Sequence, residues 1–581
     1  MPMKKFIDGI YLIDFEYHPL SGREGNPVVP VCMVVREWHS ASTKRYWHTE
    51  LRSMTEAPFP TGDNALCVAY FACAEMDCFN VLGWLIPKNL LDLYVEFRCL
   101  TNGLKTPHGN GLLGALLYFG LSTIGGDNKE KMRELILNRG PWGDEDQLKI
   151  LDYCESDVLA LGNLLDVMQE LIDWPRALLR GQYMKVVSAI QINGISIDPK
   201  ILSLLNDNWE HIKARLIEEV DRDYCVFEGL QFKKVLWERY LTDNDIPWPR
   251  LKSGQLDLSD NTFRDMALSY PLIGPIRELR AALSSLRLSS LQVGDDARNR
   301  CLLSPFKSTT GRNQPSTSKF IFGPSVWLRG LIKPPQGWGL AYIDWSQQEF
   351  GIAAALSEDT NMMSAYQSGD PYLAFAKQAG AAPAHATKHT HETVREQFKA
   401  CVLAVQYGMG EESLALRINQ PVARARQLLG LHRQTYRKFW KWSDSAVDEA
   451  VLNGRLWAGF GWQIHTAEDF NSRSLRNFPM QANGAEMLRI ACILLHENGI
   501  RICAPVHDAL LIEARLEELD AVVAKAQSLM QEASRITLNG FALSSDAKLI
   551  RYPDRYMDKR GKKMWDIVMN LIQEQTLENV Q

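Results

Sequence analysis

Two apolar segments far apart in the sequence each carry an aspartate where a buried strand would end or turn. The first is 340–343, followed by Asp344; the second is 502–512, in which His507 and Asp508 separate two apolar runs. A charged pair between two apolar runs is typical of a hairpin turn. We therefore predict a strand over 339–344, a helix over 346–356 and a β-hairpin over 502–512 whose turn holds Asp508.

Each of these aspartates, taken alone, is more often an N-cap or a turn residue than a ligand. Two carboxylates brought together could instead hold a pair of Mg²⁺ ions roughly 3.5–4 Å apart, an arrangement suited to phosphoryl transfer. Both interpretations of Asp344 and Asp508 stay open on these residues alone.

A third feature is a run of residues four positions apart. Arg395, Lys399, Leu403 and Tyr407 would form one stripe on a helix, and Gly408 follows them. Two cations one turn apart on the same face could clamp the phosphates of a nucleotide. The alternative is an ordinary amphipathic helix with exposed Arg and Lys side chains.

Charge is distributed unevenly along the chain. The net charge is -5, yet 298–333 holds seven basic residues and no acidic one, and 413–443 is likewise basic, with aromatic residues between the charges. Basic stretches with aromatic side chains suit contact with phosphates and stacked bases. Two solvated faces are the alternative.

The length of 581 residues predicts three or four packed units, and 46% hydrophobic and 23% charged residues indicate an ordinary globular protein. The 11 cysteines lack CxxC pairs, so we expect free thiols in a reducing cytosol.

No apolar run reaches the ~18–20 residues that cross a bilayer. Asp8 and Asp14 interrupt the apolar N-terminal stretch, which argues against a signal peptide.

A second set of acidic residues lies near the N-terminus. Asp14 and Glu16 end an apolar strand and would point to the same side of it, so they can share a metal. Tyr153 and Asp157 would lie one turn apart on a helix. Two further acidic residues, Glu75 and Asp77, follow the strand at 65–71.

With these motifs in view, the chain resembles the family A DNA polymerases, the DNA polymerase I family. Asp344 to Glu349 resembles motif A, Arg395 to Gly408 resembles the fingers helix of motif B, and Val506-His507-Asp508 resembles motif C. Two further segments resemble elements that touch the primer–template minor groove: 310–312, which contains Arg312, and the segment with Arg473, Asn477 and Gln481. The five motifs occur in the family's order between residues 310 and 508.

The resemblance implies a role for each matched residue. Asp344 and Asp508 would hold metal ions with the backbone carbonyl of Trp345. Arg395 and Lys399 would bind the nucleotide phosphates, and Leu403 and Tyr407 would lie near the sugar and base. Glu349 would be a steric gate against ribonucleotides, and His507 would lie near the primer terminus. Two alternatives stay open: Glu349 could be a solvated residue of a helix, and His507 could only shape the turn.

Three positions depart from the family's pattern. Leu403 stands where the family usually has an aromatic residue, which should loosen contact with the nucleotide sugar. Ala509 replaces an acidic residue after Asp508, so we expect two palm carboxylates rather than three. Gly351 stands where motif A usually has an arginine.

The N-terminal acidic set resembles the 3′–5′ proofreading exonucleases of the four-carboxylate class with a tyrosine. This implies an RNase H-like α/β domain in which Asp14, Glu16 and Asp157 hold metals and Tyr153 orients the attacking water. The resemblance also implies a fourth carboxylate after the strand at 65–71. We favour Glu75 for it, with Asp77 as the second choice and an inactive site as the alternative. Since Asp14 lies almost at the start, we expect the separate 5′ nuclease of bacterial DNA polymerase I to be absent from this chain.

The resulting hypothesis is an exonuclease domain at 1–175, a helical thumb at 176–300, and an α+β palm at 301–360 and 451–581 interrupted by helical fingers at 361–450. We expect a DNA polymerase that uses primer–template DNA, dNTPs and Mg²⁺, with Mn²⁺ as a substitute, in the cytoplasm of a bacterium or of a phage-infected host. A single-subunit RNA polymerase and a catalytically silent DNA-binding scaffold are the rival hypotheses.

Overall fold

The computed structural model describes residues 6–122, 127–251, 253–284, 290–323, 325–406, 408–466 and 471–578. Contacts divide the chain into two compact units. The larger contains 1–193, 303–314 and 341–549, and the smaller contains 194–302, 315–340 and 550–581. The first residues expected in the thumb, from 176 to 193, belong to a helix of the larger unit. Among the described helices, none is both long and apolar enough to cross a membrane.

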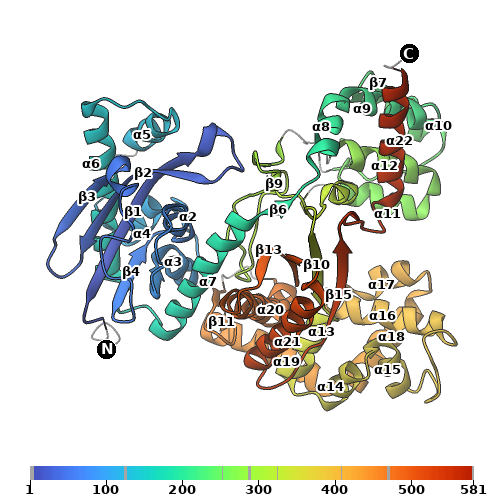
Figure 1. Ribbon diagram of the computed structural model, residues 1–581. Coiled ribbons are helices and arrows are strands. Elements are labelled where there is room, and N and C mark those ends of the chain that lie inside the picture. Colours follow the sequence, from blue (N-terminus) through green and yellow to red (C-terminus); the bar gives the residue numbers. More distant parts are fainter. Residues whose placement is uncertain are drawn as a thin grey trace. The chain divides into compact units, whose positions relative to one another are not determined.

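The N-terminal part of the larger unit is built on a five-stranded sheet in the order β3-β2-β1-β4-β5 (Figure 1). β1 pairs antiparallel with β2 and parallel with β4. The strands of this region are β1 (Gly9–Pro19), β2 (Val28–Glu37), β3 (Thr43–Trp47), β4 (Ala65–Ala69) and β5 (Asn89–Asp92). Its helices are α1 (His48–Leu51), α2 (Cys73–Leu82), α3 (Leu93–Thr101), α4 (Leu112–Tyr118), α5 (Asp127–Leu137), α6 (Asp144–Met168) and α7 (Trp174–Asn193), with the 3₁₀ turn η2 (Leu20–Gly22).

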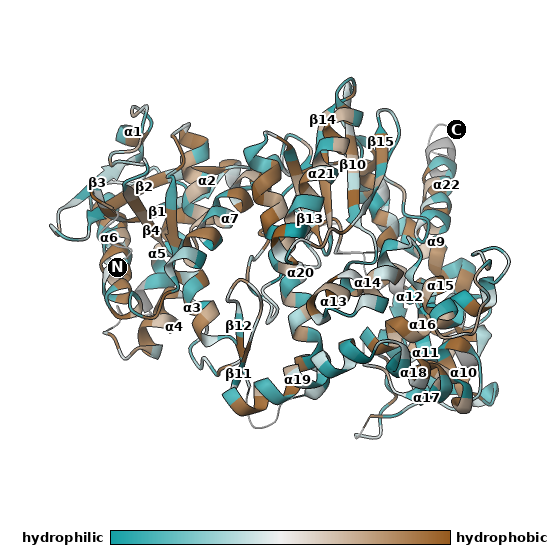
Figure 2. Ribbon diagram, turned by 90° about the horizontal axis from the view of Figure 1, so that it is seen from below, coloured by the Kyte–Doolittle hydropathy of each residue, from teal (hydrophilic) through white to brown (hydrophobic). Residues whose placement is uncertain are grey.

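Alternation along β1 decides which side chains face which helix. Ile10 and Leu12 pack into the apolar layer that includes Cys154 and Val158 of α6, whereas Ile13 and Phe15 belong to the opposite layer. Because side chains alternate along a strand, Asp14 and Glu16 continue on the face of Ile10 and Leu12. In Figure 2, the ribbon of this sheet carries brown, hydrophobic stretches alongside teal, hydrophilic ones.

The rest of the larger unit centres on a four-stranded sheet in the order β13-β14-β10-β15. Its strands are β10 (Trp338–Trp345), β13 (Arg501–Val506), β14 (Ala509–Arg515) and β15 (Ser545–Arg551), and β11 (Arg455–Trp457) pairs with β12 (Gln463–His465). The predicted strand at 339–344 and the hairpin at 502–512 are confirmed, and His507 and Asp508 form the turn between Val506 and Ala509.

The helices of this region lie in the chain between β10 and β13, except the last, which follows β14. They are α13 (Gln348–Ser357), α14 (Thr360–Gln367), α15 (Pro371–Gln378), α16 (Glu392–Gln406), α17 (Glu411–Ile418), α18 (Val422–Thr435), α19 (Arg437–Asn453), α20 (Ser472–Glu497) and α21 (Leu519–Thr537). The helices predicted over 346–356 and from Arg395 onward correspond to α13 and α16.

The smaller unit is mainly helical, as predicted for 176–300. It contains α8 (Pro199–Asp207), α9 (Trp209–Asp221), α10 (Lys234–Asp243), α11 (Asp260–Ser269), α12 (Gly274–Ser284) and α22 (Lys562–Glu578), the turns η3 (Pro271–Ile273) and η5 (Val326–Leu331), and the short strands β6 (Ile195–Ser196), β7 (Phe227–Glu228), β8 (Gln231–Phe232) and β9 (Arg298–Asn299). Residues 201–216, whose aliphatic side chains recur at helical spacing, fall in two helices, α8 and α9. The backbone of Asn208 leaves helical geometry between them.

Candidate active sites

Asp344 and Asp508 meet at one end of the four-stranded sheet. Asp344 lies near the end of β10, and the N–H of the next residue, Trp345, donates to the carbonyl of Asp508 at 3.4 Å. Asp508 follows His507, whose φ of +58° makes the tight turn between β13 and β14. The two aspartates, 164 positions apart in sequence by their residue numbers, are therefore brought together by the pairing of the hairpin with β10.

The electrostatics of this pair favour a cation. Burial, followed by the negative charges of Asp508 and Asp546, raises the pKa of Asp344 to about 7. Burial also raises the pKa of Asp508. The Oδ1 atom of Asp344 is buried and has no hydrogen-bond partner. Adjacent carboxylates with an unpaired oxygen fit a divalent metal ion, which would neutralise their repulsion.

Sequence reasoning missed Asp546, on β15. Its carboxylate accepts a hydrogen bond of 2.7 Å from the hydroxyl of Ser346, two residues after Asp344. An acidic residue from the neighbouring strand thus stands near Asp344, although Ala509 replaces the acid expected after Asp508. In the sequence, Asp546 is a single Asp in a polar segment that matches no motif, so nothing marked it as a site residue.

Gly351 and Ala509, the other departures in this region, occupy places with little room. A Cβ atom on Gly351 would lie 2.5 Å from the side chain of Leu543 and 2.9 Å from the ring of Tyr366. Ala509 is fully buried at the start of β14. Packing therefore explains the absence of an arginine at residue 351.

Glu349, in the first turn of α13, faces Arg312. The guanidinium Nη2 of Arg312 lies 3.5 Å from the Glu349 carboxylate, and the two side chains are 28% and 21% exposed. Burial raises the pKa of Glu349, while the charge of Arg312 opposes that shift. The charge of Arg312 likewise opposes the rise that burial causes in the pKa of Asp508. The structure thus brings the segment 310–312 to the carboxylate site.

On α16, Arg395 and Lys399 are both paired with carboxylates. Arg395 Nε lies 2.6 Å from Asp370, its Nη1 lies 2.5 Å from Glu396, and Lys399 Nζ lies 3.6 Å from Glu396. Lys399 and Leu403 line one cavity of about 390 Å³. Tyr407 lies outside the described residues.

Arg473, Asn477 and Gln481, predicted to contact the minor groove, lie on α20. Arg473 and Asn477 line a cavity of about 760 Å³ together with side chains of α16, α18 and α19. Arg426, Arg433 and Arg476 also line this cavity, and the guanidinium of Arg433 lies 4.3 Å from the ring of Trp440. Gln481, one turn after Asn477, lies on the same helix but is not among the lining residues.

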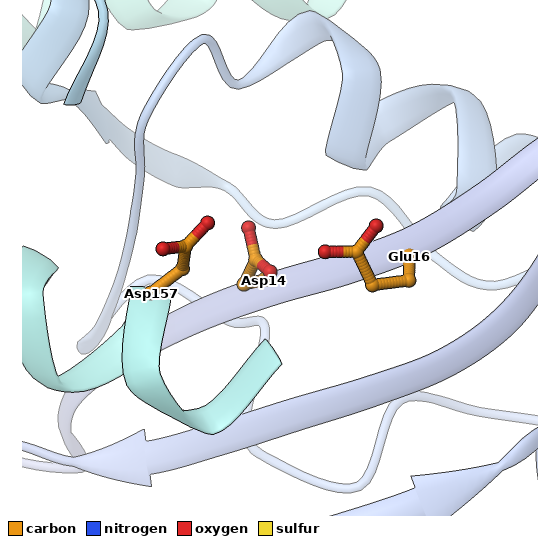
Figure 3. A group of neighbouring side chains, drawn as sticks. All are labelled: Asp14, Glu16 and Asp157. Atoms are coloured by element: carbon orange, nitrogen blue, oxygen red, sulfur yellow. The ribbon is translucent and has the colours of Figure 1, made fainter. Parts of the chain in front are cut away.

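A separate acidic site lies on the five-stranded sheet. Asp14 and Glu16 of β1 and Asp157 of α6 place carboxylate oxygens within 4.8 Å of one another (Figure 3). Burial, followed by the charge of Asp157, raises the pKa of Asp14 to about 8, and burial also raises the pKa values of Glu16 and Asp157. Three neighbouring, partly buried carboxylates have the charge and ligand type that divalent metal ions require.

Glu75 and Asp77 differ in their surroundings. Glu75 is 4% exposed, its Oε2 atom has no hydrogen-bond partner, and burial followed by the charges of Asp14 and Glu16 raises its pKa. Asp77 instead accepts a hydrogen bond of 2.6 Å from the hydroxyl of Ser188 on α7. Only Glu75 therefore shares the electrostatic environment of Asp14 and Glu16.

Tyr153 and Lys129 complete this acidic site. Tyr153 lies one turn before Asp157 on α6, and its pKa is raised by burial and then by Asp157, Glu16 and Asp14. Lys129 of α5, which sequence reasoning missed, places its Nζ atom 3.7 Å from Asp157. A lysine in a charged helix carries no signal that could have marked it.

Comparison with known proteins bears on the polymerase motifs. Residues 323–547 match the model of DNA polymerase family A. The thermostable DNA polymerase I of Thermus caldophilus is 26% identical over 403 residues, which cover 64% of this chain and 48% of that protein. DNA polymerase I of Aquifex aeolicus is 22% identical over 435 residues, which cover 67% of this chain and 73% of that protein. The chain spans about half the length of the first of these relatives.

A solved structure is similar over nearly the whole chain. The POL domain of Pol1 from M. smegmatis, in complex with a DNA primer–template and dNTP, aligns with a TM-score of 0.69, 16% identity and 98% coverage of both chains. At this identity the likeness concerns the fold. The matched segment 323–547 and the DNA polymerase I relatives show that this part of the chain is similar in sequence to the family A DNA polymerases.

Proposed function

We propose that this chain extends the 3′ end of a DNA primer with dNTPs on a DNA template. The observation that carries the proposal is the meeting of Asp344 and Asp508 beside Arg312 and Glu349. Asp344, Glu349 and Asp508 lie in the segment 323–547 that matches the family. The similar POL domain was solved with primer–template DNA and dNTP, which supports these as the substrates.

In the proposed reaction, the primer 3′ oxygen attacks the α-phosphorus of the dNTP, and the bond to the pyrophosphate breaks. Asp344 and Asp508, with the carbonyl of Trp345, would hold Mg²⁺, which supplies Lewis-acid activation of the hydroxyl and charge neutralisation at the phosphates. The unpaired Oδ1 of Asp344 is suited to this role.

The other residues of the site bind and position the substrates. Arg395 and Lys399 exchange the carboxylates of Asp370 and Glu396 for the phosphates of the incoming nucleotide. Leu403 faces the same cavity as Lys399 and contacts the nucleotide without an aromatic ring. Tyr407 is proposed to lie near the templating base, and His507 near the primer terminus.

DNA contacts are assigned to the side chains around the basic cavity. Arg473, Asn477 and Gln481 on α20 contact the minor groove and the terminal base pair of the primer–template, and Arg312 contacts the minor groove. Arginine and asparagine donors suit the acceptor atoms that every base pair presents in that groove. Glu349 crowds the position of a ribose 2′ hydroxyl.

The acidic site on the five-stranded sheet is proposed to be a 3′–5′ proofreading exonuclease in an RNase H-like domain. Asp14, Glu16, Glu75 and Asp157 would hold the metal ions, which polarise the scissile phosphate, and Tyr153 would orient the attacking water. The clustering of three carboxylates within 4.8 Å supports this second activity.

One experiment tests both activities. A labelled primer–template is incubated with the protein and Mg²⁺, with and without dNTPs. We expect extension with dNTPs and 3′ degradation without them. Asp508→Asn should abolish extension and leave degradation, whereas Asp14→Asn should do the reverse. Full extension by Asp508→Asn would contradict the polymerase mechanism, and full degradation by Asp14→Asn would contradict the exonuclease site.

A further inference from the structure

In the loop that carries Arg312, every second backbone carbonyl from 307 to 311 accepts a hydrogen bond from a side chain outside the loop. Arg98 of α3 donates to the carbonyl of Lys307 at 2.9 Å. The carbonyl of Thr309 accepts from Asn102 at 2.7 Å and from Trp462 at 3.0 Å. The carbonyl of Gly311 accepts from Arg489 of α20 at 2.7 Å. The backbone immediately before Arg312 is therefore set by side chains that lie elsewhere in the sequence.

Two of these donors, Arg98 and Asn102, come from the N-terminal region that carries the proposed exonuclease site. Asn102 follows α3 and is fully buried, so it cannot touch DNA itself. Its amide Nδ2 donates both to Thr309 and, at 2.7 Å, to the carbonyl of Gln463 on β12. The N–H of His465 donates to the carbonyl of Asn102 at 2.8 Å. Asn102 thus joins three segments at one point.

The helix that carries these donors is itself anchored. Glu96 of α3 forms a buried, two-pronged ion pair with Arg180 of α7, at 2.8 and 2.6 Å. On the other side of the loop, Arg489 pairs with Glu486 and is 4% exposed. Because paired, buried charges resist displacement, both sets of donors have fixed positions.

The loop itself has little freedom to adjust. Gly311 adopts a φ of +72°, and a Cβ atom there would lie 3.1 Å from the ring of Trp462. The hydroxyl of Ser308 accepts from the N–H of Arg312 at 2.8 Å, which closes the turn. A shift of the carbonyl of Thr309 would therefore be passed on to Arg312 rather than absorbed between them.

We infer that Asn102 is a positioning residue for DNA binding at the polymerase site, acting through the loop 307–312 on Arg312. This rests on the proposed role of Arg312 in holding the primer–template. It means that the N-terminal region, besides any exonuclease activity of its own, sets the geometry of a DNA contact at the polymerase site.

The test measures the Kd of the full-length protein for a fluorescent primer–template by anisotropy, in EDTA so that neither activity changes the DNA. Asn102→Ala should raise the Kd about tenfold, since it removes two buried hydrogen bonds that hold the loop and the adjoining strand. Arg98→Met, a milder change to a less buried donor, should raise it about threefold. At saturating DNA, the extension rate should stay close to that of the unchanged protein.

A matched control is Asn89→Ala. The amide of Asn89 also donates to two backbone carbonyls, those of Asp63 and Ala65, at 2.8 and 3.1 Å, but it does not touch the loop. It should leave the Kd unchanged. Thermal unfolding of each variant shows whether the fold is retained, and Arg98→Met provides the answer if Asn102→Ala does not fold.

A double-mutant cycle separates positioning from general stability. In an Arg312→Ala background, Asn102→Ala should cause no further rise in Kd. An equal further rise there, or an unchanged Kd in folded Asn102→Ala and Arg98→Met, would overturn the inference. If Arg312→Ala alone binds DNA normally, the proposed function of Arg312 is wrong; if it binds weakly while Asn102→Ala binds normally, only the role of Asn102 is wrong.

Discussion

The guanidinium of Arg312 lies 3.5 Å from the carboxylate of Glu349, and its charge also acts on Asp508. This ion pair joins the loop before β10 to the first turn of α13 beside the carboxylate site. Glu349 is therefore held in a defined position, as a residue that excludes a sugar hydroxyl would need to be.

Replacement of Glu349 should change the choice of sugar. In Glu349→Ala, the space vacated by the carboxylate can accept a ribose 2′ hydroxyl, so the preference for dNTPs over rNTPs should fall by about 100-fold. The ratio of kcat/KM values for dATP and ATP measures this. Glu358→Ala, an exposed position after the same helix, is the control. An unchanged ratio in Glu349→Ala would exclude it as a steric gate.

Glu396 should compete with the incoming nucleotide for Arg395 and Lys399. It contacts both cations, and its side chain is 50% exposed, so its attraction is partly screened by solvent. Glu396→Gln should lower the KM for dNTPs by about twofold to fivefold with little change in kcat. Glu392→Gln, one turn earlier on α16, should have no effect. A raised KM in Glu396→Gln would mean that its charge helps to position the cations.

Glu75 and Asp77 should differ sharply in their effect on 3′ degradation. Glu75→Gln removes a proposed metal ligand, so the rate of degradation should fall by about 100-fold or more. Mutation of residues that only hydrogen-bond to metal ligands already lowers activity by about 10–100-fold. Asp77→Asn keeps an oxygen that can accept from Ser188, so degradation should stay within about threefold of normal. Single-turnover degradation of a labelled oligonucleotide decides between them, and the reverse ranking would reassign the ligand.

Stability in the absence of metal should depend on pH. The pKa of Asp14 is raised from 3.8 to about 8 and that of Asp344 from 3.8 to about 7, so the folded state retains protons that the unfolded chain releases. In EDTA, the contribution of these two carboxyl groups to the free energy of unfolding should be largest below pH 4. It should fall as the pH rises from about 4 to about 8.

Thermal unfolding from pH 5 to pH 9 measures this dependence. Asp14→Asn should flatten it, whereas Asp144→Asn, at an exposed position at the start of α6, should not. Added Mg²⁺ should stabilise the protein most at high pH, where the carboxylates are ionised. A stability that rises with pH in EDTA would contradict the raised pKa values.

Local patterns in the sequence predicted the main elements around both sites. The apolar run before Asp344 predicted β10, and the His507-Asp508 pair predicted the hairpin of β13 and β14. The four-residue spacing from Arg395 predicted α16. These predictions succeed because strand alternation, helical periodicity and turn chemistry depend on residues close together in the chain.

Contacts between distant segments could not be predicted in this way. Glu75 and Asp77 are two residues apart and equally acidic, and only the packing of α2 against β1 and α7 gives one the charges of Asp14 and Glu16 and the other the hydroxyl of Ser188. Asp546 reaches the surroundings of Asp344 only because β15 pairs with β10.

The sequence by itself determined which residue types could do chemistry and which local element would carry each of them. The tertiary structure decided which side chains meet: Arg312 with Glu349, Arg395 with Asp370, and Asn102 with the carbonyl of Thr309. The physical reason is that a side chain's hydrogen bonds and pKa depend on what surrounds it in space, and those neighbours come from strands and helices that only folding brings together.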